Sequence, residues 1–385
     1  MKALRNLIDN MKPSFEKGGK LHMFHSVFEG FETFLFNPDT TSKSGTHIHD
    51  HIDLKRTMSI VIMALIPATL FGMYNVGYQH FGAIGELAGQ GFFDIFLFGF
   101  LKVLPIIIVS YGVGLGIEFA FAQMRGHEIQ EGFLVSGILI PLVMPVDVPL
   151  WMVAVATAFA VIIGKEVFGG TGMNIWNPAL IARAFLFFAY PSYMSGDSVW
   201  VNIGEGQKVV DGFSGATPMA LAAAGKTDID VWNAFIGLIP GSIGETSTLA
   251  ILIGAVVLIA TGIGSWKIMV STVAGAMVTG LLLNAFAVNA YMALPAWEHL
   301  IIGGFAFGAV FMATDPVTAS QTSRGKWIYG FLLGVLAIII RVVNPAYPEG
   351  MMLAILLMNT FAPLIDHYVV QGNIKKRLKR ASVNA

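Results

Sequence analysis

One short segment carries side chains whose types and spacing suit the attachment of a phosphorylated cofactor. Residues 211–218 read Asp211-Gly212-Phe213-Ser214-Gly215-Ala216-Thr217-Pro218. On an exposed loop, the Thr217 hydroxyl stands beside small residues and could be esterified by a phosphate-bearing cofactor, while Asp211 could help to position a metal–nucleotide donor. The simpler interpretation is a turn that leads into a short helix, with Thr217 as its N-cap and Pro218 at the first helical position. Spacing alone does not choose between them.

Three carboxylates stand in or beside long apolar runs. Glu118 lies within the apolar run 98–123, Asp315 follows a short apolar stretch, and Asp366 interrupts the last one. A charge at bilayer depth costs at least about 2.5–3.5 kcal/mol, so we expect these groups to face a cavity or a partner. Alternatively, Glu118 lies at the membrane surface, and Asp366 is a helix-end residue paired with His367 or the basic tail.

Two glycine-containing segments are further candidates. The sequence Gly169-Gly170-Thr171-Gly172 precedes Asn174 and Asn177, but no Lys-Ser/Thr follows it, which argues against a phosphate-binding loop. A simple break between two helices explains it equally well. Gly114 stands one helical turn before Glu118, where small residues often allow close helix packing.

The histidine and cysteine content limits metal and redox chemistry. No pair of the N-terminal histidines sits at i, i+4 on a clear helix, because residues 37–51 are turn-rich. These histidines are interpreted as solvated loop residues, and no metal ligand or catalytic residue is assigned: His22, His25, His47, His49 and His51. The chain has no cysteine. Thiolate-ligated iron–sulfur clusters, c-type haem attachment and disulfides within the chain are therefore excluded. Electron transfer would require an organic cofactor, or a haem held by His or Met.

The composition is that of a membrane protein. Of 385 residues, 55% are apolar and 12% are charged, whereas about 25% are charged in soluble domains. The charges crowd into residues 1–56, 197–245 and the last dozen positions. The N-terminus lacks the apolar core of a cleavable signal peptide, so the first span is expected to insert directly. The sequence predicts an all-α polytopic membrane protein.

A bilayer core needs about 20 mostly apolar residues per helix. Apolar runs between charged or Gly/Pro positions predict about ten spans, at 57–75, 98–123, 132–145, 150–164, 178–192, 246–264, 268–288, 299–314, 326–342 and 350–370. Several are too short to cross comfortably. Short or broken helices at matching places in two halves point to a binding site at mid-membrane depth.

The two halves do match. Gly132-Phe133 opens a short apolar run and a later run stops at Lys165, whereas Gly304-Phe305 and Arg341 do the same in the second half. Five spans in each half require the repeats to be inverted, an architecture like that of urea transporters. The expected divisions are a cytoplasmic extension, a first repeat, an extracytoplasmic loop, a second repeat and a basic tail: 1–56, 57–192, 193–245, 246–370 and 371–385.

Orientation follows from the Lys/Arg bias of short flanking segments. Residues 1–56 hold eight Lys/Arg residues and the tail is also basic, so both termini are expected in the cytoplasm. The loop 193–245 holds only Lys208 and Lys226 against six acidic residues and is expected on the opposite side.

Further sequence motifs, in which polar residues interrupt the apolar runs, are distributed over nearly the whole chain. They are Asp53-Leu54-Lys55-Arg56, Gly126-His127-Glu128, Glu131-Gly132-Phe133, residues 165–172, Asn177-Pro178-Ala179, residues 183–191, residues 239–245, residues 311–316 and residues 341–350. Together with the D-x-x-S-G-A-T string at 211–217, they resemble the B subunits of Na+-translocating NADH:quinone oxidoreductases. The related D subunit of Rnf complexes shares the S-G-A-T string, but the basic extension 1–56 favours the quinone reductase.

The resemblance implies a membrane subunit of a redox-driven sodium pump in a bacterial inner membrane. It implies that FMN is joined to Thr217 by a phosphoester bond, in a motif that also contains Asp211, Ser214, Gly215 and Ala216. It also implies that riboflavin is held near Asn174 and Asn177, with Trp176 available to stack on its ring. The family's quinone or ion path would include Gly114, Glu118, Phe185, Phe187, Asp315 and Asp366. Leu115 separates two glycines that are usually adjacent in the family, which puts close quinone approach there in doubt.

The implied partners are the other subunits of a six-subunit complex, quinone, Na+, membrane lipid and a flavin transferase, with no nucleic acid. NADH oxidation and iron–sulfur chemistry would belong to other subunits. Two alternatives remain open, an Rnf D subunit and a non-redox permease of the urea-transporter kind.

Overall fold

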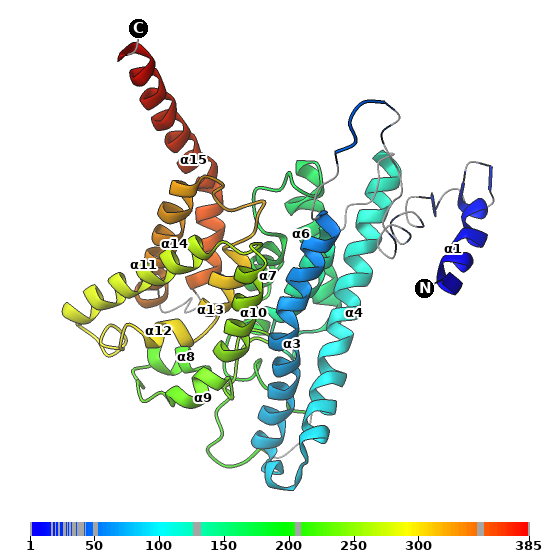
Figure 1. Ribbon diagram of the computed structural model, residues 1–385. Helices are drawn as coiled ribbons and strands as arrows, with labels where there is room; N and C mark the ends of the chain where they lie inside the picture. Colours follow the sequence, from blue (N-terminus) through cyan, green and yellow to red (C-terminus); the bar gives the residue numbers. More distant parts are fainter. Residues whose placement is uncertain are drawn as a thin grey trace.

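The computed structural model describes residues 53–125, 132–204, 209–344 and 350–383, together with 2–16 and scattered positions between 18 and 48. These residues form helices and loops with no strand (Figure 1), which confirms the predicted all-helical fold. The helices over the apolar runs are α3 Leu54–Ile84, α4 Phe92–Arg125, α5 Phe133–Leu142, α6 Leu150–Gly164, α7 Pro178–Ala189, α10 Thr248–Ala260, α11 Trp266–Ala285, α14 Ser323–Val343 and α15 Gly350–Val383.

Six helical segments in the described part of the chain are long and apolar enough to cross a membrane: Leu54–Ile84, Phe92–Arg125, Leu150–Phe168, Trp266–Ala285, Ser323–Val343 and Gly350–Ala381. The helices α5, α7 and α10 are shorter, as their apolar runs predicted. The expected span 299–314 is broken into α12 Glu298–Ile301, α13 Phe305–Phe307 and a π-helical turn, η5 Gly308–Met312. A positive φ of 63° at Gly303 marks the break between α12 and α13.

The helices α3 and α4 are much longer than the predicted spans 57–75 and 98–123. Asp53 caps the start of α3 and Gly85 ends it in the left-handed conformation. The helix continues past its apolar run because its polar residues find buried partners: Asn75 Nδ2 donates to the carbonyl of Ile239 at 2.9 Å, and His80 Nδ1 lies 2.6 Å from the carbonyl oxygen of Asn202. Hydropathy alone could not show these long-range contacts.

The packing of the helices repeats between the two halves. In the first half, α5 packs against α3, α4 and α7, and α6 packs against α4 and α7. In the second half, the α13–η5 segment contacts α10, η5 contacts α11 and α15, and α14 contacts α11 and α15. The helices therefore have equivalent neighbours in the same order along the chain, which supports an internal duplication.

The equivalent helices run in opposite directions. Gly72 of α3 packs on the backbone of Ile243, just before α10, whereas Gly254, further along α10, packs on the earlier α3 residue Ala64. The pair α3 and α10 is therefore antiparallel. The pair α7 and α15 is antiparallel too, because Trp176, just before α7, bonds Thr360, whereas Arg183 lies near the start of α15. Antiparallel packing of equivalent helices is what inverted repeats require.

One detail of the repeat sits beside each short helix. Lys165 Nζ lies 5.9 Å from the centre of the Phe133 ring in the first half, and Arg341 Cζ lies 6.0 Å from the centre of the Phe305 ring in the second. These are the residues that the sequence matched between halves. A cation over the aromatic residue that opens the short helix is thus common to both repeats.

The two ends of the bundle differ. The start of α3 and the end of α15 lie at one end, whereas α8 Pro218–Ala223 and α9 Val231–Ile236 lie at the other (Figure 1). The segment 193–245 is not wholly peripheral, because the backbone N–H groups of Ile243 and Gly244 donate to Met144 and Leu142 at the end of α5. Its last residues thereby join the helical core.

Candidate functional site

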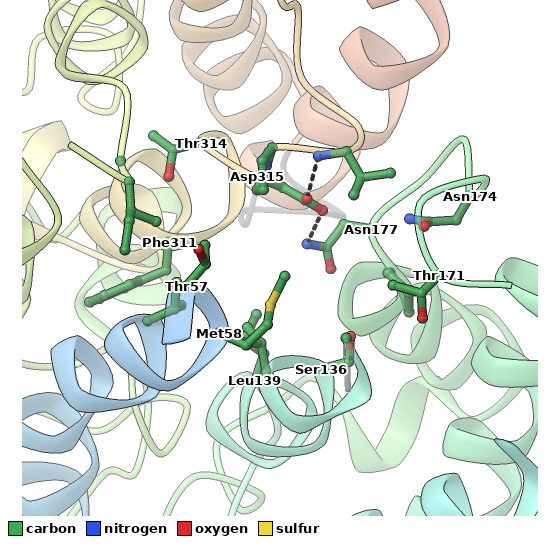
Figure 2. Close-up of a pocket in the computed structure, with 18 of the residues that line it drawn as sticks. Thr57, Met58, Ser136, Leu139, Thr171, Asn174, Asn177, Phe311, Thr314 and Asp315 are labelled. Atoms are coloured by element: carbon green, nitrogen blue, oxygen red, sulfur yellow. Dashed lines mark hydrogen bonds between the residues drawn. The ribbon is translucent and has the colours of Figure 1, made fainter. Parts of the chain in front are cut away.

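A polar cavity lies near the end of the bundle where α3 begins. Its volume is about 80 Å³, and both repeats contribute to its wall. The first repeat supplies the start of α3, the face of α5 and the segment before α7, and the second supplies the turn after η5 and the α10–α11 turn. Figure 2 shows that Asn174, Asn177 and Asp315, which were separate candidates in the sequence, line this one cavity.

Asn177 connects the two halves of the cavity. Its side-chain oxygen accepts from the N–H groups of Ala179 and Leu180 and so caps α7, with Pro178 at the first position. The cap turns its amide nitrogen toward Asp315, to which it donates at 3.2 Å (Figure 2). One amide hydrogen of Asn177 is left for a ligand.

Asp315 is held by three donors. Besides Asn177, the backbone N–H of Val317 donates to Oδ1 at 3.0 Å and the Thr318 hydroxyl donates to Oδ2 at 3.1 Å. The carboxylate therefore has the polar partners that its position required. It also orients the amide that faces it.

Asn174 stands after a glycine turn. Gly169, Gly170 and Gly172 all have φ near or above 90°, a conformation that other residues rarely adopt. Asn174 Nδ2 donates to the carbonyl of Trp176 at 3.0 Å, which leaves its carbonyl oxygen for the cavity. The Trp176 indole bonds Thr360 at 2.9 Å and is not among the residues that line the cavity, so it is not placed to stack on a ligand there.

Glu118 belongs to a buried ion pair. Lys165 Nζ donates to Glu118 Oε1, and the two side chains are only 3% and 6% exposed. Lys165 also lines the cavity, so the pair places a cation at its wall. Gly114 lies on the same side of α4, where an added Cβ would overlap the Phe133 ring. This contact is the helix-packing role considered for Gly114.

Asp366 holds the loop before α14. Its carboxylate accepts from the Ser320 hydroxyl, from the backbone N–H groups of Gln321 and Thr322, and from the Thr322 hydroxyl, at 2.6–3.0 Å. Thr322 is the N-cap of α14. The partners are thus loop groups before α14 rather than the basic tail.

The two aromatic candidates on α7 pack against neighbouring rings. Phe185 stacks on Phe159 with ring centres 4.5 Å apart, and Phe187 meets Phe188 edge-on at 5.5 Å. Neither residue lines the cavity. Their contacts are those of side chains that pack α7 against α6 and the core.

The second candidate region lies at the opposite end, around Thr217. The threonine caps α8, because its hydroxyl accepts from the N–H of Ala220 at 3.2 Å, and Pro218 occupies the first helical position. Thr217 is only 9% exposed, whereas Asp211 and Ser214 are exposed. The expectation of an exposed threonine is therefore wrong. The loop folds inward because Gly215 packs directly on the carbonyl of Asp197, where an added Cβ would overlap.

Sequence reasoning missed a second buried ion pair. Arg183 Nη1 lies 2.9 Å from Glu245 Oε2, with the side chains 4% and 9% exposed. The pair sits between α7 and the start of the second repeat, next to Gly304 and a small void lined by Met312 and Met351. An arginine inside an apolar run was the available signal, since such residues need a partner.

In the part of the chain that is described, no group of three or more His, Asp or Glu side chains gathers. Of the five N-terminal histidines, His25 and His47 are described. The other three lie outside the described residues: His22, His49 and His51.

The sequence is similar to a known protein family and to named bacterial proteins. The sequence model of the NQR2, RnfD, RnfE family matches residues 41–375. A Pseudomonas aeruginosa protein, named as the B subunit of a Na(+)-translocating NADH-quinone reductase, is 49% identical over 98% of this chain and 99% of its own length. Proteins of the same name from Chromohalobacter salexigens and Azotobacter vinelandii are each 48% identical over 98% of this chain, covering 97% and 99% of their lengths. The chain therefore belongs to the NQR2, RnfD, RnfE family.

Proposed function

We propose that this chain is the B-type membrane subunit of a Na+-translocating NADH:quinone reductase and passes electrons toward quinone while Na+ is exported. The observation that carries the proposal is identity of about half over nearly full length to proteins with that name. The same names favour the quinone reductase over an Rnf complex. Since the chain has no cysteine, thiolate-ligated iron–sulfur chemistry belongs to partner subunits, and we assign NADH oxidation to a partner as well.

Within this function, Thr217 carries FMN through a phosphoester bond. Three features support the assignment: the D-x-x-S-G-A-T string, the exposed Asp211 and Ser214 on the approach, and a threonine hydroxyl at a loop–helix junction. Because Thr217 is mostly buried in the folded loop, the flavin transferase requires the segment 211–217 to open locally. Bound there, FMN supplies one- and two-electron redox chemistry.

The test separates attachment from folding. Thr217→Asn keeps a good N-cap for α8 but has no hydroxyl to esterify, whereas Thr217→Ser keeps both. The complex is purified from cells that possess the transferase and run on a denaturing gel. We expect flavin fluorescence on this subunit in the wild type and Thr217→Ser, and none in Thr217→Asn. A fluorescent Thr217→Asn band would refute the attachment site.

Riboflavin binds in the cavity between the repeats. The carbonyl oxygen of Asn174 and the remaining amide hydrogen of Asn177 match the donor and acceptor edge of a flavin pyrimidine ring. The volume of about 80 Å³ is smaller than the roughly 300–1,000 Å³ of typical ligand pockets. A flavin ring therefore requires neighbouring side chains, such as Met58 at its wall, to move aside.

This assignment has its own test, which does not depend on Thr217. Acid extraction releases non-covalent flavin but leaves phosphoester-linked FMN on the chain. We expect Asn174→Ala to lower the extracted riboflavin per complex while the covalent FMN is unchanged. Asn233→Ala, which removes an amide from α9 far from the cavity wall, is the matched control. Equal riboflavin in both variants would exclude Asn174 from the site.

The ion and quinone path stays a proposal built on the carboxylates near the cavity. Glu118 and Asp315 supply oxygen atoms that suit Na+, and Phe185 and Phe187 lie on the helix that begins at Asn177. The cavity end is assigned to the cytoplasm from the Lys/Arg bias. The α8 end then faces outward in a bacterial inner membrane, with both termini inside.

A further inference from the structure

The second repeat holds a buried cation whose hydrogen-bonding groups are mostly unused. Arg341 of α14 is 0% exposed, and its Nη1 donates to the backbone carbonyl of His299 at 2.7 Å. Its Nε and Nη2 atoms have no hydrogen-bond partner. Arg341 also takes no part in the ion pairs formed between described residues. A buried charge left in this way is strongly unfavourable, so the folded chain requires something to meet it.

Two neighbouring side chains are unsatisfied in the same place. The hydroxyl of Tyr291 and Nδ1 of His299 are buried without partners, and both residues are at least nine-tenths buried. Their rings lie 5.9 Å apart. Since His299 is joined to Arg341 by the backbone bond, three unpartnered polar groups gather in one small region.

The first repeat shows what such a region contains when it is complete. There the cation is Lys165, the aromatic ring below it is Phe133, and the buried carboxylate of Glu118 supplies the negative charge. The second repeat has Arg341 and Phe305 at offsets of 176 and 172 residues.

Offsets of 172–176 residues from Glu118 lead to residues 290–294, just beyond the end of α11, and this stretch of the second repeat has no acid. At a similar offset of 173 residues stands Tyr291, which brings a hydroxyl donor where the first repeat has a carboxylate. The Glu245 carboxylate is close enough to interact with Arg341, but it is already paired with Arg183. Neither buried carboxylate of this region forms an ion pair with Arg341, because Glu245 is paired with Arg183 and Glu298 Oε2 has no partner. We propose that Arg341 and Tyr291 form an occluded binding site for a small inorganic anion of halide size.

Arg341 supplies donors for such an anion, but these atoms have no water-sized space beside them, so neighbouring side chains have to move aside when the anion binds. Nε–H and Nη2–H lie on one edge of the planar guanidinium and point the same way, a fork that receives anions. The Tyr291 hydroxyl adds a third donor. Water would satisfy the hydrogen bonds but not the charge, which is poorly screened in an apolar interior.

Helix α8 closes the site. A Cβ built on Gly303 would lie 2.6 Å from Met219 Sδ and 3.5 Å from Arg341 Nη2, so the Met219 side chain packs beside the guanidinium. Methionine is a flexible side chain that adapts to irregular gaps. Movement of α8 is the route by which an anion enters. The anion site does not depend on flavin attachment, because none of its donors belongs to the segment 211–217.

The first experiment locates the anion directly. Crystals of the intact complex are grown with sodium bromide in place of sodium chloride, and the anomalous signal of bromine is mapped. We expect a peak within hydrogen-bonding distance of Arg341 Nε and Nη2. Density for water alone, or the Glu298 carboxylate turned toward the guanidinium, would overturn the proposal, since Glu298 Oε2 is also buried without a partner.

The second experiment measures binding in solution by the melting midpoint of the complex. Sodium gluconate is exchanged for sodium bromide at constant sodium and ionic strength. We expect a saturable rise in the midpoint for the wild type and no rise for Arg341→Gln. Tyr291→Phe should raise the half-saturating bromide concentration about tenfold, the effect of losing one hydrogen bond to a charged group.

The controls keep the result decisive. Arg380→Gln removes an equal charge from the exposed tail and should leave the bromide response unchanged. If Arg341→Gln does not fold, the Tyr291→Phe titration and the bromine map decide. An identical bromide response in the wild type and Tyr291→Phe, with no bromine peak, would refute the site.

Discussion

A single methyl group added at Gly114 should separate packing from ligand binding on α4. The Cβ of Gly114→Ala would overlap the Cζ atom of Phe133, which is fully buried and lies close to Lys165. The ring has no free space to move into, so the overpacking cost is about 1–3 kcal/mol. Replacing a helical glycine by alanine gains about 1 kcal/mol. The net effect is a loss of up to about 2 kcal/mol.

Gly116 provides the matched control two residues away. No atom lies within 4 Å of a Cβ built there, so Gly116→Ala keeps only the helical gain of up to about 1 kcal/mol. The two variants should therefore differ by about 1–3 kcal/mol in opposite directions from the wild type. The assay is the thermal midpoint of the detergent-purified complex, followed by intrinsic tryptophan fluorescence.

The expected order of midpoints is Gly116→Ala above the wild type and Gly114→Ala below it. The variant pair Gly114→Ala with Phe133→Leu should recover part of the loss, because the smaller side chain makes room for the methyl group. Equal midpoints for Gly114→Ala and Gly116→Ala would show that Phe133 does not fill this face of α4. The packing interpretation of Gly114 would then be wrong.

Three further outcomes follow from the buried polar groups. Lys165→Met should destabilise the fold by about 3–5 kcal/mol, because it leaves the Glu118 carboxylate buried and unpaired. Adding Glu118→Leu should restore most of this loss in the same melting assay. A double variant that is no more stable than Lys165→Met would contradict the pairing. Asp366→Asn should lower stability by about 1–3 kcal/mol, because the side chain that accepts four hydrogen bonds from the loop before α14 loses its charge. Proteolysis at residues 317–322 should become faster. An unchanged cleavage rate would argue against Asp366 holding this loop in place. Burial raises the pKa of Tyr291 from 10.0 to about 12, so the folded state holds this proton more tightly than the unfolded state. This contribution to the free energy of unfolding should be complete below about pH 10 and be lost between about pH 10 and 12. The stability of Tyr291→Phe, measured by its melting midpoint, should fall less over that range.

Much of the fold follows from hydropathy. The apolar runs predicted the positions of the bundle helices, except that the run 299–314 is broken into α12, α13 and η5. The matched pairs Gly132-Phe133 and Gly304-Phe305 predicted the duplication. The lengths of α3 and α4 did not follow. The extra turns of α3 have partners such as Ile239 and Asn202, which are more than 100 residues away.

The residues of the candidate site could be predicted from the sequence, but which of them bond one another could not. Asp315 was singled out because a charge at membrane depth needs a partner, whereas Asn174 and Asn177 were singled out because they follow the glycine-rich break at 169–172. That Asn177 and Asp315 bond each other across 138 residues could only come from the fold. The same holds for Glu118 and Lys165, whose pairing spans 47 residues.

The Thr217 segment shows a different limit of sequence reasoning. Small residues around the hydroxyl suggested an open loop, yet in the structure they permit close packing, as Gly215 does on Asp197. Small side chains favour access and burial equally well. Local composition therefore could not decide how exposed the hydroxyl is.

Because the repeats are inverted, the same arrangement of helices occurs twice, with opposite orientations across the membrane. A duplicated helix break that opens inward in one copy must open outward in the other, and each copy reaches only part of the way through the bilayer. The chemistry at the two breaks differs, since one has an acid beside its cation, Glu118 with Lys165, while the other has the phenol of Tyr291 near Arg341. In a protein built in this way, a two-fold axis in the membrane plane exchanges the two breaks, so that they face opposite sides of the bilayer.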